Sequence, residues 1–169
     1  LIVSLNPGGP NGGSATQYFI GNFDGKSFKP DALPYPLWLD YGRDNYAGVT
    51  FNNIPATDGR RIFMGWMSNW DYANQVPTKY FRSANTSPRE LKIVNNGKHM
   101  ILSSFPVVEM NKIKDKMIEL PDLQVATNAT IAELLEQNDG SYEINMSVKP
   151  DDAEVFGFSL GNSKGELLV

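Results

Sequence analysis

Residues 142–149 read YEINMSVK, an unbroken alternation of apolar and polar side chains. Successive side chains of a β-strand point to opposite faces of its sheet, so this stretch predicts an antiparallel strand with one buried and one exposed face. A second alternating run occupies residues 156–160, and a turn at residues 161–165 leads toward a third. The end of the chain is therefore predicted to be a sheet of short strands.

The same period of two recurs near the start of the chain. Tyr18 and Ile20 alternate with Phe19 and Gly21, and the run ends at the dipeptide 24–25, Asp-Gly, which is a strong hairpin signal. The 15 glycines and 11 prolines suit many short strands joined by tight turns. The predicted fold class is therefore all-β.

Only one stretch favours a helix. Thr130 and Glu133 form a capping-box pattern ahead of two leucines, and an Asp-Gly pair at 139–140 ends the pattern after about two turns. We expect a short connecting helix there and no other.

Composition excludes several classes of function. The net charge of −4, without a basic cluster, argues against nucleic acid as a partner. There is no cysteine, so disulfides and thiolate metal sites are excluded, and we expect neither a metal nor a cofactor. No apolar run approaches the ~20 residues that span a bilayer. The stretch 21–27 does not fit the spacing of a phosphate-binding loop, and nucleotide binding is not expected.

Two carboxylates and an arginine alternate with aromatic residues in the segment 38–47, WLDYGRDNYA. Sugars present apolar C–H faces and hydroxyl edges, which aromatic platforms beside carboxylates can bind. A solvated strand edge with buried aromatics explains the pattern equally well. Asp40 and Asp44 make a poor glycosidase pair, because four residues of strand span ~13 Å and the two carboxyls need to be ~5 to ~9.5 Å apart. A sharp bend at Gly42 would be required to bring them together.

Two further segments carry candidate residues. In residues 64–72, MGWMSNWDY, Trp66 and Trp70 are four apart, and core packing and ligand stacking remain equally good explanations. In residues 82–91, RSANTSPREL, Arg89 is expected to link neighbouring strands rather than to act in catalysis. The single histidine, His99, lies in a plain hairpin with the sequence NNGK at residues 95–98 and is expected to be inert.

Together these segments resemble glycoside hydrolase family 32, which includes levanases, exo-inulinases and invertases. Four stretches carry the resemblance, in order: NPGGPNGGSATQYFIGNFDG at 6–25, WLDYGRDNYA at 38–47, MGWMSNWDYANQVPT at 64–78 and RSANTSPREL at 82–91. The resemblance is strong over residues 1–110 and weaker beyond. It implies a five-bladed β-propeller followed by a β-sandwich.

The same resemblance gives a domain organisation. Residues 1–110 are expected to form part of the propeller, namely the end of one blade and about two more. Residues 111–121, a charged and weakly periodic run, are expected to be a linker, and residues 122–169 part of the sandwich. Because the chain begins and ends within apolar runs, at 1–3 and 167–169, we expect it to be an excerpt of a longer protein.

The activity implied is that of a retaining glycoside hydrolase that releases fructose from levan, inulin or sucrose. The family's nucleophile lies in a WMNDPNG-like motif, its stabilising aspartate in an RDP motif and its acid/base in a WECP-like motif. This sequence contains none of the three. The resemblance thus implies that the catalytic carboxylates lie upstream and that these 169 residues alone are inactive.

Three substrate-binding residues follow from the matched motifs. Asp40 matches the aspartate of a D-[YF]-G motif, Asp44 matches an acidic position of the bacterial members, and Trp66 matches a tryptophan that lines the fructose subsite. A non-catalytic fructan-binding protein on the same scaffold and a fructosyltransferase remain alternatives. An extracellular or periplasmic location is expected, because fructans are large polymers.

Overall fold

Short β-strands make up most of the regular secondary structure in this computed structural model, which describes residues 1–130, 141 and 143–161. The chain divides into two units, Leu1–Asp115 and Lys116–Val169. Their boundary falls inside residues 111–121, the segment interpreted above as a linker. The all-β prediction is confirmed, since the helical residues described are two 3-10 helices, η1 (Ala73–Gln75) and η2 (Val108–Ile113).

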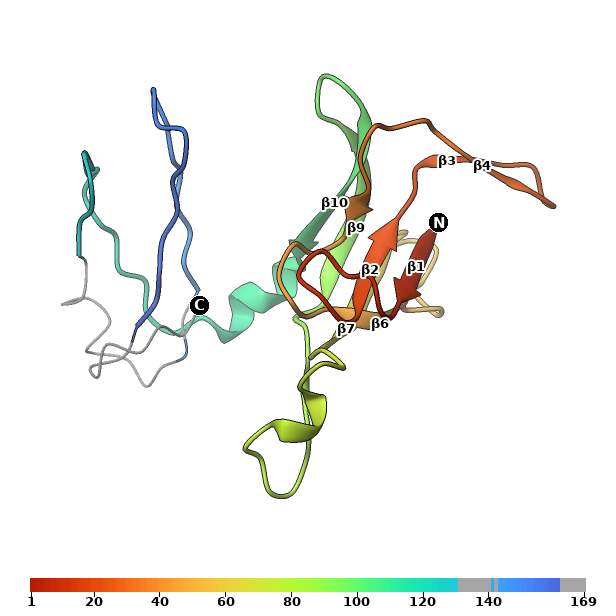
Figure 1. The fold of residues 1–169 in the computed structure, drawn as a ribbon, viewed down its shortest axis with the longest axis horizontal. Coiled ribbons are helices and arrows are strands. Elements are labelled where there is room, and N and C mark those ends of the chain that lie inside the picture. The colour runs from red at the N-terminus through yellow and green to blue at the C-terminus, as the bar shows by residue number, and fades with distance from the viewer. Residues whose placement is uncertain (131–140, 142, 162–169) are drawn as a thin grey trace. The chain divides into compact units, whose positions relative to one another are not determined.

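The first unit begins with a three-stranded antiparallel sheet (Figure 1). Its order is β1 (Ile2–Leu5), β2 (Ala15–Tyr18) and β5 (Leu37–Trp38), with β2 in the centre. Most of β2 is buried, as its central position requires. The chain reaches β5 by way of a separate two-stranded ribbon, β3 (Gly21–Phe23) and β4 (Phe28–Pro30).

The ribbon confirms the hairpin predicted from the Asp-Gly dipeptide. Oδ1 of Asp24 accepts hydrogen bonds from the backbone N–H groups of Lys26 and Ser27, both at 2.7 Å. Gly25 has a φ of 94°, in the left-handed region that glycine adopts without a steric cost. The turn is therefore determined by local sequence.

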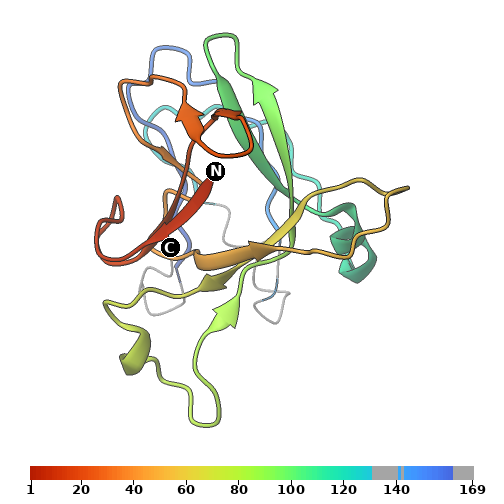
Figure 2. The same cartoon turned by 90° about the vertical axis from the view of Figure 1, so that its right-hand side faces the viewer.

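The second sheet is an up-and-down antiparallel meander. Its order is β10 (Met100–Pro106), β9 (Arg89–Asn95), β7 (Ile62–Met67) and β6 (Tyr46–Thr50). The short strand β8 (Ala84–Asn85) pairs with the end of β7, and β9 pairs with its beginning. Between β7 and β8 the chain makes a long excursion, which contains η1 and projects away from the sheets (Figures 1 and 2).

The two sheets share one apolar core. Phe63 on β7, only 1% exposed, and Leu91 on β9 cluster with three residues of the first sheet and its flank: Tyr18, Leu37 and Leu39. The ring of Phe63 occupies the space beside Gly48, where an added Cβ would lie 1.9 Å from the ring. Glycine at position 48 is thus what allows β6 to pass over Phe63.

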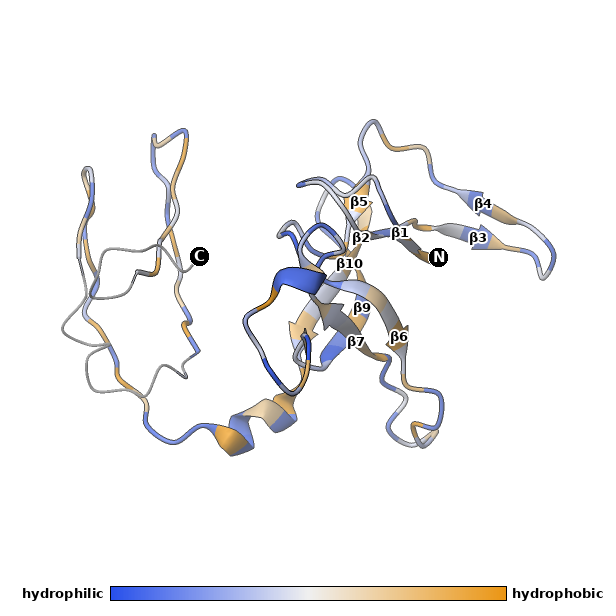
Figure 3. Cartoon of the chain, turned by 60° about the horizontal axis from the view of Figure 1, so that its bottom comes forward, coloured by the Kyte–Doolittle hydropathy of each residue, from blue (hydrophilic) through white to orange (hydrophobic). Residues whose placement is uncertain are grey.

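An ion-pair cluster ties the β6–β7 connection to η2. The Arg60 guanidinium donates hydrogen bonds to both carboxylate oxygens of Asp58, at 2.7 and 2.8 Å. It also donates to both oxygens of Glu109, at 2.8 and 3.0 Å. These bonds lower the pKa of Glu109 to about 2. Figure 3 shows the mixed apolar and polar character of η2, to which Glu109 belongs.

This cluster leads to a prediction about acid stability. Because the pKa of Glu109 is depressed in the folded protein, its stabilising effect is present above the ordinary value of 4.5 and is lost as the pH falls toward about 2. We expect Glu109→Gln to lower the melting temperature at pH 6, with the difference from wild type disappearing near pH 2. Thermal melts from pH 2 to 7 test this, with Glu119→Gln as the matched control; equal melting temperatures at pH 6 would contradict it.

The second unit departs from the sequence prediction. Residues 143–149 and 156–160 form no strand, and three apolar side chains of the first stretch, Ile144, Met146 and Val148, are 37–49% exposed. The strands predicted there are therefore wrong for the described residues. The physical reason is that an alternating sequence makes a strand only when a neighbouring strand supplies hydrogen bonds, and none pairs with it among the described residues. The helix predicted between residues 130 and 140 lies almost wholly outside the described residues, and so does the turn predicted at 161–165.

No helix in the described part of the chain has the length and apolar character needed to cross a membrane.

Candidate functional site

Three loops that carry the sequence motifs meet around the side chain of Asn69. They are the Gly-rich loop 6–14 between β1 and β2, the loop 39–45 between β5 and β6, and the segment 68–72 that follows β7. Asn69 is fully buried, and its Nδ2 donates hydrogen bonds to the carbonyl oxygens of Gly12, Ser14 and Arg43. Its Oδ1 accepts from the N–H groups of Ser14 and Asp71, at 3.2 and 3.0 Å. One side chain thus joins all three motif segments.

Local sequence explains how this junction forms. The strand β7 ends at Met67, and the N–H groups of Tyr72 and Ala73 donate to the carbonyl of Asn69, which turns the chain into η1. Gly13 has a φ of 61°, and an added Cβ there would lie 1.9 Å from Oδ1 of Asn69. Only glycine lets the loop 6–14 approach so closely.

Asp40, the first predicted substrate-binding residue, is held by two partners. Its Oδ1 accepts from the backbone N–H of Gly42 at 2.8 Å, and its Oδ2 accepts from Nη1 of Arg89 at 3.3 Å. Both side chains of this ion pair are about a quarter exposed. Arg89 therefore ties the loop 39–45 to the start of β9, rather than linking two neighbouring strands as expected, while its neighbour Glu90 pairs with Lys92.

Asp44, the second predicted residue, accepts a hydrogen bond from the phenol of Tyr72 through Oδ1. Burial raises the pKa of Tyr72, and the bond to Asp44 raises it further, so the phenol stays protonated and remains a donor. Within the described residues, Oδ2 of Asp44 accepts no hydrogen bond. The Asp44 residue is partly exposed.

Arg43, which sequence reasoning left without a role, lies at the centre of this polar network. Its Nη2 pairs with Oδ2 of Asp71 at 2.9 Å, and its guanidinium lies 5.7 Å from the centre of the Tyr72 ring. Arg43 thereby links the loop 39–45 to the segment 68–72 at the surface. Its partner lies 28 residues away in the sequence, so spacing alone gave no signal for the pair.

Trp66, the third predicted residue, belongs to a cluster of aromatic rings from β6, β7 and the segment 68–72. Its ring centre lies 6.2 Å from that of Tyr46 in an edge-on arrangement and 4.9 Å from that of Trp70 in a tilted one. Trp66 is only partly buried and Trp70 is half exposed. The ring of Trp66 therefore packs against its neighbours and is still partly exposed, so a role in ligand stacking stays a prediction.

Asn45 is a buried polar residue that sequence reasoning missed. It is 1% exposed with a φ of 79°, its N–H donates to the carbonyl of Trp66, and its own carbonyl accepts from Oγ1 of Thr16. Asn45 therefore ties the end of the loop that carries Asp44 to the strand that carries Trp66. The side-chain amide has no partner among the described protein atoms.

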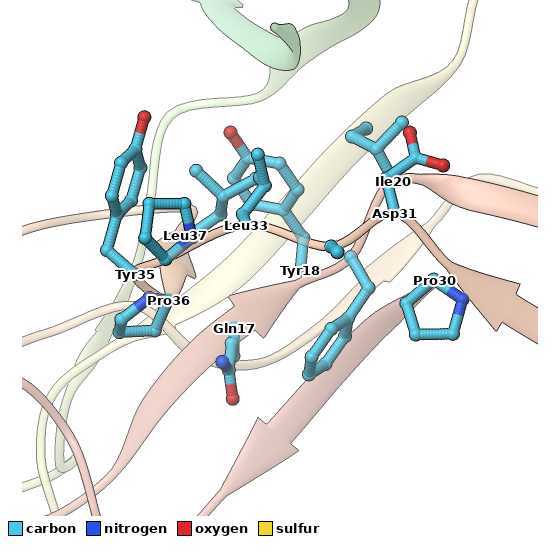
Figure 4. A pocket seen from close by; sticks show the side chains of 12 residues that line it. Gln17, Tyr18, Ile20, Pro30, Asp31, Leu33, Tyr35, Pro36 and Leu37 are labelled. Atoms are coloured by element: carbon cyan, nitrogen blue, oxygen red, sulfur yellow. The ribbon is translucent and has the colours of Figure 1, made fainter.

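A separate cleft of about 440 Å³ lies between β2 and the segment 30–37. Figure 4 shows that prolines and apolar side chains such as Leu33 and Leu37 surround it, with one carboxylate, Asp31. It contains none of the three predicted residues. No group of three or more His, Cys, Asp or Glu side chains in the described part of the chain could hold a metal ion.

Comparison with known proteins identifies relatives of this chain. The sequence model described as "Glycosyl hydrolases family 32 N-terminal domain" matches residues 1–104. The levanase of Bacillus subtilis (strain 168) is 42% identical over 169 residues, covering 98% of this chain and 25% of the levanase. An extracellular exo-inulinase of Meyerozyma guilliermondii is 34% identical, covering 100% of this chain and 32% of that enzyme. The chain thus spans a quarter to a third of the length of these curated relatives.

Two solved structures of related enzymes match between 62% and 63% of this chain. The exo-inulinase from Aspergillus awamori matches with a TM-score of 0.57 and 39% sequence identity, over 62% of this chain and 22% of that one. The fructofuranosidase from Schwanniomyces occidentalis, solved in complex with fructose, matches with a TM-score of 0.55 and 38% identity, over 63% of this chain and 21% of that one.

Proposed function

Since this chain belongs to glycosyl hydrolase family 32, we propose that the protein containing it is a retaining β-fructosidase. It releases fructose from β-fructans such as levan and inulin, or from sucrose. Levanase, exo-inulinase and invertase are the names of its curated relatives. The proposal concerns the whole protein, because the chain covers 25–32% of the first two of those relatives.

The observation that carries this proposal is the convergence of the motif segments. The loop with Asp40 and Asp44 meets β7 with Trp66 at a junction built from three stretches that the family match includes. An aromatic surface beside carboxylate acceptors is the chemistry that recognises a sugar ring.

Each residue has a role in the proposal. Trp66 packs its partly exposed ring against the apolar face of the fructosyl unit. The free oxygen of Asp44 accepts a hydrogen bond from a sugar hydroxyl, and Tyr72 orients that carboxylate from the other side. Asp40, held by Arg89, accepts from a second hydroxyl through its remaining lone pairs.

The reaction proceeds in two displacements. In the first step a carboxylate attacks the anomeric carbon while a carboxylic acid protonates the leaving oxygen. In the second step water hydrolyses the fructosyl-enzyme, and the residue that donated the proton in the first step acts as the base. Two inversions give net retention. The proposal assigns neither carboxylate to residues 1–169, and it places both in the remainder of the protein.

For the scaffold we propose part of a five-bladed β-propeller followed by part of a β-sandwich, in which residues 143–149 and 156–160 become strands only when the remainder of the protein supplies the strands that pair with them. The meander β6–β7–β9–β10 supplies four antiparallel strands of a five-stranded sheet, and propeller blades repeat four-stranded antiparallel sheets. The division into residues 1–110, 111–121 and 122–169 stays a prediction. We also propose an extracellular or periplasmic site of action, because polymeric fructans do not cross membranes; two of the related exo-inulinases are named as extracellular.

Fructose release tests the function. The complete protein is incubated with levan, inulin and sucrose, and the anomer formed first is followed by NMR. We expect fructose from at least one substrate, with retained configuration. A folded protein that binds fructan without releasing fructose would be the non-catalytic alternative, and transfer of fructosyl units to sugar instead of water would indicate a fructosyltransferase.

A further inference from the structure

We propose that Asn69 is a positioning residue, which holds the loop carrying Asp44 against the segment carrying Trp66 in the arrangement that a fructosyl unit requires. This inference rests on the proposed function. Asn69 itself is fully buried and therefore acts through its neighbours.

The first support is that the Asn69 amide is saturated. A primary amide offers two N–H donors and one oxygen with two lone pairs. Here the two donors serve three carbonyl oxygens, at 2.6, 3.1 and 3.2 Å, and the oxygen accepts from two N–H groups. Among short side chains, only the asparagine amide combines N–H donors and an acceptor oxygen in one plane. The carboxylate of aspartate has the same shape but supplies acceptors alone.

The second support is where these bonds lead. The shortest of them, at 2.6 Å, ends on the carbonyl of Arg43, the residue that directly precedes Asp44. The bond from the N–H of Asp71 fixes the residue whose carboxylate pairs with the Arg43 side chain. A ring of contacts thus runs from Asn69 through Arg43 and Asp71 and back to Asn69.

A third observation connects this ring to the proposed sugar contacts. Tyr72, three residues after Asn69, donates to Asp44, and Trp70, next to Asn69, contacts the ring of Trp66. The N–H of Trp70 also donates to Oγ of buried Ser14. Displacing Asn69 therefore moves both an acceptor and an aromatic surface of the proposed site at once.

The test uses Asn69→Asp in the complete protein. This variant keeps the shape and the acceptor, but it replaces the donor that faces three carbonyl oxygens with a second acceptor. A misplacement of about 1 Å can reduce a rate by about 100-fold. We expect kcat for fructose release to fall about 10- to 100-fold, measured 20 °C below the variant's own melting temperature. Asn53→Asp, at an exposed position, is the matched control and should leave kcat, KM and melting temperature unchanged.

The outcomes separate positioning from mere structural support. A lower melting temperature with wild-type kcat and KM at the matched temperature would overturn the proposal. If Asn69→Asp does not fold, Asn69→Ser, which introduces no charge, is assayed in the same way and read by the same criterion. Fructose titration followed by tryptophan fluorescence gives a readout independent of catalysis, in which we expect weaker binding by the variant. If the wild-type protein releases no fructose, the proposed function fails, and equal fructose affinity of wild type and variant would then overturn the positioning role separately.

Discussion

Replacing Trp66 with alanine is expected to lower kcat/KM for β-fructoside hydrolysis by about 100-fold, which corresponds to about 2.7 kcal/mol of transition-state stabilisation. The reason is that Trp66 offers its partly exposed ring to the sugar while Trp70, 4.9 Å away, supports it from the side. Alanine removes the surface that stacks on the sugar, and it also removes the ring contacts that Trp66 makes with Trp70 and Tyr46. Steady-state kinetics on levan, inulin and sucrose measure the effect.

Two variants control this experiment. Trp66→Phe keeps an aromatic face and should recover most of the activity. Tyr80→Ala removes an aromatic ring that is 98% exposed on the excursion between β7 and β8, and it should leave kcat/KM unchanged. Unaltered kinetics of Trp66→Ala, in a protein with a wild-type melting temperature, would remove Trp66 from the proposed site.

Replacing Gly48 with alanine is expected to give the largest loss of stability, about 3 kcal/mol in the free energy of unfolding, at the upper end of typical overpacking costs. The new methyl group would lie 1.9 Å from the ring of Phe63, which is 1% exposed at the centre of the core. Either the ring or the strand β6 has to move, and the close packing of the core resists both movements. Denaturant unfolding measures the change.

A double variant identifies the cause of this loss. If the clash with the ring is responsible, Phe63→Leu combined with Gly48→Ala should be less destabilised than the sum of the two single changes. Gly157→Ala is the matched control, because nothing lies within 4 Å of its added Cβ. Strict additivity of the two single effects would show that strand propensity, rather than the ring, disfavours alanine at position 48.

Sequence reasoning reached the candidate site through motifs and missed the contacts that assemble it. Asp40, Asp44 and Trp66 were nominated from segments that resemble a known family. Nothing in the sequence indicated that Asp40 pairs with Arg89, 49 residues away, or that Asn69 bonds to Ser14, 55 residues away. These pairs depend on how two sheets fold back on each other, and spacing along the chain carries no information about that.

What the sequence by itself determined was the all-β class and two tight turns, namely the Asp-Gly hairpin at residues 24–25 and the hairpin at residues 95–98, where Oδ1 of Asn95 accepts a hydrogen bond from the N–H of Gly97. Each turn depends on a few adjacent residues whose backbone preferences need no distant partner. Tertiary structure alone decided that Phe63 requires a glycine at position 48 and that one buried asparagine joins three loops. It also decided that the alternating residues 143–149 form no strand here, because a strand exists only through hydrogen bonds to a neighbour that its own sequence cannot supply.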